Sequence, residues 1–98
     1  MIRHTVLFTW NPEATEEEKR RVATEVAKLP SIVPSVRAFA CGPDAGLAAQ
    51  GNFDFAVSAD FDDEAGYLAY RDDPGHRQVV QKYIAPILAQ RAAVQFEF

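Results

Sequence analysis

The chain has 98 residues, of which 48% are hydrophobic and 11% aromatic, and it carries a formal net charge of −4. This length fits one domain covering residues 1–98, and so high an apolar content argues against a disordered chain. The acidic balance argues against nucleic acid or an anionic membrane as a partner, because both require clustered lysine and arginine.

The first half of the chain contains three predicted strands and one helix. Residues 2–10 alternate in character, which predicts a strand with His4, Val6 and Phe8 on one face. Thr15 and Glu18 have the spacing of a capping box and predict a helix that ends before Pro30. Residues 33–41 and 53–61 are the next two predicted strands. The segment 42–52 between them is long for a hairpin loop, and such loops are often functional or mobile.

Two helices and a strand are predicted in the second half. Asp62 or Asp63 caps the first helix, and Asp73 caps the second, with proline at its tolerated first position. Pro86 predicts a kink or break near the end of this second helix. Residues 91–98 are predicted to form the last strand.

This element order predicts an α+β fold of the ferredoxin-like, split βαβ kind. One four-stranded antiparallel sheet would carry the helices on a single face, above the side chains of Val6, Phe8, Phe55 and Phe61. The opposite face is too apolar to remain in water; it carries Thr5, Leu7, Thr9, Ala56 and Ser58. We therefore expect a homodimer that buries this open sheet face.

Tyr70 and His76 flank the turn between the last two predicted helices. A phenol and an imidazole facing one apolar pocket can move a proton on and off a small substrate, which makes this pair the candidate catalytic residues. In the alternative interpretation, Tyr70 is a core tyrosine and His76 holds the helix entry by hydrogen bonding.

The candidate pocket lies between the sheet and the helices. We expect its lining to include His4, Phe8, Phe55, Tyr67 and Tyr83. His4 is equivocal, because an inward histidine on a strand is often a satisfied core residue. A cavity of about 300 Å³ or more that reaches Tyr70 and His76 would favour a bound molecule. A space packed with aromatic side chains would favour a purely structural role.

No cofactor, metal or nucleotide site is indicated. The two histidines lack metal-ligand spacing, and the glycines of segment 42–52 match no phosphate-binding motif. Cys41 is the only cysteine, so no intramolecular disulfide can form and a cytoplasmic location is expected. Because Cys41 lies near a predicted strand end, we expect it to be structural. No stretch of the chain is long and apolar enough to span a bilayer.

The chain resembles the stress-responsive A/B barrel (Dabb) domain family along almost its whole length. The resemblance rests on residues 4–8, Leu29-Pro30, Gly42, Phe61 and, most specifically, Tyr70 followed by Asp73-Pro74-Gly75-His76. It implies a dimeric α/β barrel made of two ferredoxin-like units that pack their sheets together.

One member of that family with known chemistry, the plant olivetolic acid cyclase, closes a linear polyketide without a cofactor. The resemblance matches its catalytic tyrosine and histidine to Tyr70 and His76, and one pocket histidine to His4. A second pocket histidine corresponds to Phe55, where this chain carries a bulky apolar side chain.

Three functions therefore fit the sequence. The first is a cofactor-independent lyase or cyclase acting on a small carbonyl or polyketide-like compound. The second is a module that binds a small apolar ligand without chemistry, and the third is a stress-related dimer whose assembly is its function.

Overall fold

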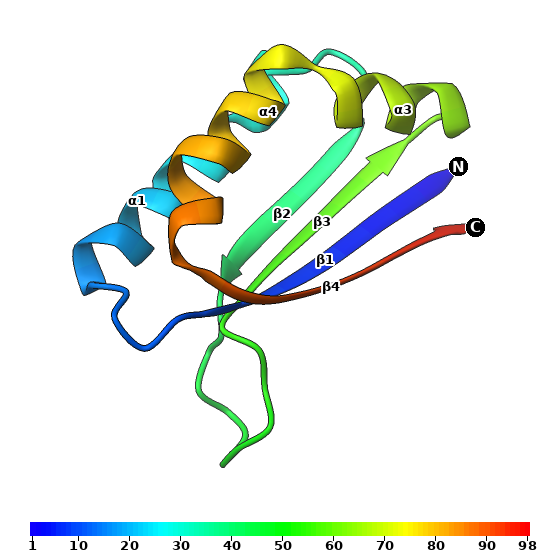
Figure 1. Cartoon of the computed structure of the whole chain (residues 1–98). Coiled ribbons are helices and arrows are strands. Elements are labelled where there is room, and N and C mark those ends of the chain that lie inside the picture. The colour runs from blue at the N-terminus through cyan, green and yellow to red at the C-terminus, as the bar shows by residue number, and fades with distance from the viewer.

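A four-stranded antiparallel sheet carries all the helices on one face (Figure 1) in the computed structural model, which describes all 98 residues. The strand order is β2-β3-β1-β4, formed by β1 (Ile2–Trp10), β2 (Ala38–Pro43), β3 (Phe55–Phe61) and β4 (Leu88–Glu97). The helices are α1 (Glu16–Val26), α2 (Leu29–Ile32), α3 (Glu64–Asp72) and α4 (Pro74–Val79). Helix α4 continues through a π-helical turn, η1 (Val80–Ile84), and a 3₁₀ turn, η2 (Ala85–Ile87). The predicted ferredoxin-like fold is confirmed.

The helix starts follow the predicted caps. The hydroxyl of Thr15 accepts from the backbone N–H of Glu18 at 3.1 Å, and the carboxylate of Glu18 accepts from the backbone N–H of Thr15 at 2.9 Å. Asp63 rather than Asp62 caps α3. Asp73 caps α4 by accepting from the backbone N–H groups of the second and third residues after it.

Several helix and strand boundaries differ from those predicted from the sequence. The helix capped by Thr15 ends at Val26, before Pro30 as predicted, but Pro30 itself lies in the first turn of α2, where a missing backbone N–H removes no hydrogen bond. Strand β2 begins at Ala38 because Val33 instead closes α2, its N–H donating to the carbonyl of Leu29. Strand β4 begins at Leu88, three positions before the predicted start, because its pairing with β1 extends as far as Trp10.

The buried core lies between the sheet and the helices, as predicted. Val6, Phe8, Phe55 and Phe61 are all 6% exposed or less. The aromatic side chains gather at the two ends of the sheet. Phe8 and Phe55 pack against Trp10 at one end, and Phe61 packs against two tyrosines of α3 at the other. The two clusters leave a less densely filled region between them.

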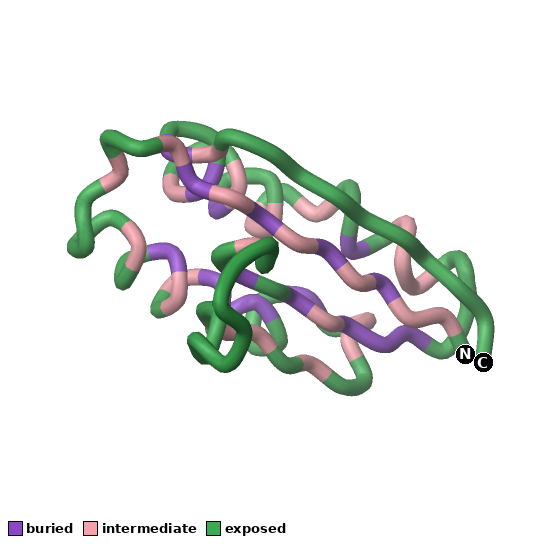
Figure 2. The backbone as a smooth tube through the Cα atoms, turned by 90° about the horizontal axis from the view of Figure 1, so that it is seen from below, coloured by how far each residue is buried: buried purple, intermediate pink, exposed green.

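The other face of the sheet is uncovered, and β4 is exposed along almost its whole length (Figure 2). Val94, Phe96 and Phe98 are 43–57% exposed. Val94 and Phe96 pair with Thr5 and Arg3 of the open face of β1, so these apolar side chains face away from the helices. Arg3 and Asp60 add a two-pronged ion pair on the same side, with N–O distances of 2.7 and 2.8 Å.

None of the helices is long and apolar enough to cross a membrane.

Candidate ligand-binding and proton-transfer site

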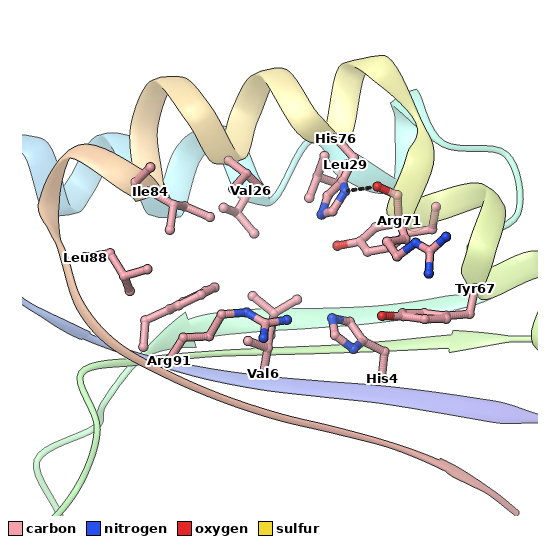
Figure 3. Close-up of a pocket in the computed structure, with 15 residues that line it drawn as sticks. His4, Val6, Val26, Leu29, Tyr67, Arg71, His76, Ile84, Leu88 and Arg91 are labelled. Atoms are coloured by element: carbon pink, nitrogen blue, oxygen red, sulfur yellow. Dashed lines mark hydrogen bonds between the residues drawn. The ribbon is translucent and has the colours of Figure 1, made fainter.

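A cavity of about 190 Å³ lies between the inner face of the sheet and the α4–η1 segment (Figure 3). Most of its lining is hydrophobic, and the polar side chains gather toward the α3–α4 corner and β4. The lining residues contributed by the sheet are His4, Val6, Phe8, Val57, Leu88 and Arg91. The volume is below the 300 Å³ expected from sequence for a ligand pocket, but the space is not packed with aromatic rings.

The sharp corner between α3 and α4 brings Tyr70 and His76 together. Tyr70 lies in the last turn of α3 and His76 in the first turn of α4, and Asp73 between them fixes the second helix start. The two ring centroids are 4.1 Å apart with an interplanar angle of 34°, so the rings are in close, tilted contact. The Tyr70 side chain is only 2% exposed. Its hydroxyl makes no hydrogen bond within the chain and borders the cavity.

His76 presents an unprotonated nitrogen to this region. Its Nδ1 is 3.4 Å from the carbonyl oxygen of Arg71, which can only accept a hydrogen bond. The neutral ring therefore carries its proton on Nδ1 and leaves Nε2 as an acceptor. Burial lowers the pKa of His76, although the contact with the Arg71 carbonyl and the charge of Asp73 both raise it. Desolvation prevails, and the ring is neutral near pH 7.

His4 has the opposite arrangement of proton and lone pair. The side-chain amide of Gln95 on β4 donates to Nδ1 of His4 at 2.8 Å, which leaves Nε2–H as a donor. Burial, with smaller contributions from the charges of Arg91 and His76, lowers the pKa of His4 to about 4. The His4 ring centroid lies 5.1 Å from that of Tyr67 and 6.0 Å from that of Tyr70. The site thus combines one imidazole donor with one imidazole acceptor.

Tyr70 retains its proton at any ordinary pH. Burial is the main cause that raises the pKa of its hydroxyl, and the charged forms of Tyr67 and Cys41 act in the same direction. A neutral phenol can donate a hydrogen bond to a developing oxyanion. Tyr70 is therefore suited to hydrogen-bond donation and His76 to proton acceptance.

The depressed pKa of His4 makes stability depend on pH. Unfolded His4 takes up a proton below about pH 6.5 and folded His4 only below about pH 4, so the unfolded state binds more protons between these values. Stability is therefore lost as the pH falls through this window. Lowering the pH from 7 to 5 should cost about 2 kcal/mol through His4 alone.

The matched variant is His4→Gln, which keeps a polar side chain but cannot titrate. Urea unfolding at a fixed protein concentration measures the free energy of unfolding at pH 7 and pH 5. The decrease between these pH values should be smaller in the variant by about 2 kcal/mol. Equal losses in the two proteins would contradict a buried, neutral His4.

Five of the seven residues proposed from sequence meet at this cavity: His4, Phe8, Tyr67, Tyr70 and His76. The structure places Phe55 and Tyr83 elsewhere. Phe55 pairs across the strands with Phe8 and packs on Trp10 at the far end of the sheet. Tyr83 lies in η1 near Arg21 of α1, because the π-helical turn rotates it away from the cavity.

Several lining residues were not identified from sequence, including Arg71, Arg91 and the aliphatic side chains of α1, α2 and η1. Gln95, which orients His4, was also missed. The alternation within the last strand offered a signal, because Arg91 and Gln95 share one face and Val94 and Phe96 the other. No group of three histidine, cysteine or acidic side chains comes together in the geometry of a metal site.

The comparisons with known proteins agree with this architecture. The model of the stress responsive A/B barrel domain matches residues 2–98. A dimeric ferredoxin-like protein of unknown function from Thermobifida fusca is 49% identical with a TM-score of 0.90, and the match covers 99% of this chain and 90% of that one. A search of curated proteins gave no match.

Two further solved structures share the fold. A Dabb family protein from Mesorhizobium loti is 26% identical with a TM-score of 0.81, and the match covers 98% of this chain and 94% of that one. A hydroxynitrile lyase from Passiflora edulis has a TM-score of 0.83 at 16% identity, with coverage of 97% and 90%.

Proposed function

The chain belongs to the stress responsive A/B barrel domain family, and from that premise we propose that it is a homodimer, paired through the open sheet face, that binds a small, largely apolar molecule in the cavity between sheet and helices. The observation that carries the ligand proposal is the Tyr70 hydroxyl. It belongs to a side chain that is only 2% exposed, borders an apolar cavity and has no hydrogen-bond partner in the chain. The hydroxyl is not fully enclosed, since Oδ1 of Asn11 is the one fully buried side-chain atom without a partner. It therefore keeps accessible surface, where a bound molecule would supply a hydrogen-bond partner.

The size of the cavity limits the ligand. An apolar cavity of roughly 150 Å³ accommodates benzene, and this one measures about 190 Å³. The ligand is therefore about one ring in size with a short substituent. Acetophenone, benzyl alcohol and phenol are suitable neutral probes, because each combines such a ring with one polar oxygen.

Filling the cavity should abolish binding. Val80 lines the cavity from η1 and is half-buried, so Val80→Phe places a ring in the space that the ligand would occupy. We expect calorimetry to detect acetophenone binding to the wild-type protein and none to this variant. The free energy of unfolding should change by about 1 kcal/mol or less, since the added atoms enter existing space.

Gln81→Phe is the matched control, because Gln81 lies in the same turn but is exposed and outside the cavity. This variant should bind acetophenone like the wild type. Equal affinity in the Val80 variant, or no binding of any probe by the wild type, would contradict the ligand proposal.

The dimer proposal is supported by the uncovered apolar row on β4. Val94, Phe96 and Phe98 lie on a sheet face that no helix covers, and a second copy in a face-to-face arrangement would bury them. Homologous structures, including the Thermobifida protein, are dimeric. The ion pair between Arg3 and Asp60 lies on the same face and would also become buried.

A charge on this face should dissociate the dimer. Phe96→Glu introduces a carboxylate that would lose its hydration in the interface. Sedimentation velocity should therefore show a dimer dissociation constant that is at least about tenfold higher than that of the wild type. Leu47→Glu is the control, because Leu47 is 92% exposed in the loop between β2 and β3, away from the sheet face. A Phe96 variant that remains as dimeric as the Leu47 variant would contradict pairing through this face.

A second candidate function is cofactor-independent proton transfer by a lyase or cyclase. It is favoured by the complementary protonation of the site, with an acceptor on His76 and donors on Tyr70 and His4. Nε2 of His76 would remove a proton from a carbon next to a carbonyl, and the Tyr70 hydroxyl would hydrogen-bond to the enolate oxygen. The Passiflora protein, a hydroxynitrile lyase, shows that this fold can carry a lyase activity.

A further inference from the structure

The charged side chains that line the cavity are all cationic. Arg71 and Arg91 contribute to the lining, and no aspartate or glutamate does. Arg71 is held in a two-pronged pair with Asp72, at 2.9 and 3.1 Å, and Asp72 also pairs with Arg77 at 3.3 Å. Arg91 makes no hydrogen bond and no ion pair within the chain. Arg91 is therefore the one arginine of the lining that has no carboxylate partner.

The register of β4 explains why an arginine points inward. Val94 and Phe96 face the open side of the sheet, so Arg91 and Gln95, at positions of the opposite parity, face the helices. Arg91 is paired with Phe8, and Gln95 with His4. Arg91 extends from β4 into the cavity beside Val6, and His4 lies on the other side of Val6 (Figure 3).

The other polar groups of the site also favour an anion. The Gln95 bond makes Nε2 of His4 a donor, and the hydroxyl of Tyr70 is a donor without a partner. A guanidinium, an imidazole N–H and a phenol around one apolar space form a donor set that matches a carboxylate. Arg91 is exposed to solvent, so water solvates its guanidinium in the empty cavity, and a carboxylate would add a charge-assisted hydrogen bond that a neutral ligand lacks.

We propose that the ligand of this cavity is a carboxylic acid about one ring in size, whose carboxylate lies between the guanidinium of Arg91 and Nε2–H of His4. This inference rests on the proposed ligand-binding function and specifies its ligand class. The apolar body of the acid occupies the space lined by Leu29, Val80 and Ile84.

Benzoate and benzamide provide the test, because they have nearly the same shape and differ in charge. At pH 7, calorimetry should show that benzoate binds about tenfold more tightly than benzamide. This difference is at the lower end of the range for charged hydrogen bonds, because Arg91 is exposed to solvent. Arg91→Gln should weaken benzoate binding by about tenfold and leave benzamide binding unchanged.

Arg20→Gln is the matched control. Arg20 is exposed on α1 and does not line this cavity, so the variant has the same net charge as the Arg91 variant and should bind benzoate like the wild type. Equal wild-type affinity for the two probes would overturn the carboxylate inference while leaving the proposed binding function intact. An Arg91 variant with unchanged benzoate affinity and a weakened dimer would also overturn it, assigning Arg91 to the subunit interface. Failure of both probes to bind would overturn the carboxylate inference, and the acetophenone titration described above would decide the binding function separately.

Discussion

Replacing Phe61 with alanine is expected to lower the free energy of unfolding by about 3–5 kcal/mol. Phe61 is fully buried on β3, and its ring centroid lies 5.2 Å from that of Tyr70 and 5.9 Å from that of Tyr67. Its removal creates a void directly beneath the helix that carries both tyrosines. The loss is a large fraction of the roughly 5–15 kcal/mol that stabilises a typical domain.

Urea unfolding measures this loss, with Phe53→Ala as the matched control. Phe53 is only half-buried and lies before the start of β3, outside the buried core. Its truncation should cost less than half as much. Equal losses in the two variants would contradict the account of Phe61 as the support of the α3 tyrosines.

His76→Gln should slow proton abstraction by about 100- to 10,000-fold if the site catalyses proton transfer. The reason is that glutamine keeps a polar side chain but cannot accept the proton that Nε2 of His76 would take. Tyr70→Phe should produce a loss of about the same order, since it removes the donor to the enolate oxygen while retaining the ring.

The exchange of acetophenone methyl hydrogens for deuterium in D₂O, followed by NMR, measures this rate without knowledge of the natural substrate. Binding of acetophenone should change by less than about threefold in either variant, since the apolar wall supplies most of the contact area. Tyr83→Phe is the control, because Tyr83 lies outside the cavity. This variant should catalyse the exchange of acetophenone hydrogens at the wild-type rate. Wild-type rates in the His76 variant would remove the catalytic candidate and leave a binding role.

Local patterns predicted the fold because each strand and cap has a short-range signal. The alternation of residues 2–10 correctly identified which face of β1 is buried. Asp73 followed by proline correctly located the start of α4 and therefore the approach of Tyr70 to His76. These predictions succeeded because strand periodicity and helix capping depend on residues at most a few positions apart.

The membership of the cavity was harder to predict, because it depends on position along the sheet as well as on the face. Phe55 lies on the inner face, but at the end where Trp10 fills the space. Predicting that Tyr83 lies outside the cavity would have required knowing that η1 is π-helical, because a π-helical turn shifts the direction of each following side chain. Arg91 faces inward because Val94 and Phe96 of β4 face outward. In a single subunit, these hydrophobic residues would be expected to face the core.

The most direct test of ligand binding uses the fact that the chain has two histidines and both line the cavity. The imidazole NMR resonances therefore report on this site alone. During a titration with acetophenone, the resonances of His4 and His76 should shift together with one dissociation constant, and Val80→Phe should abolish the response. Resonances that remain unmoved by acetophenone, benzyl alcohol, phenol and benzoate, with His76 titrating near 6.5 as in a free peptide, would contradict a ligand site in this cavity.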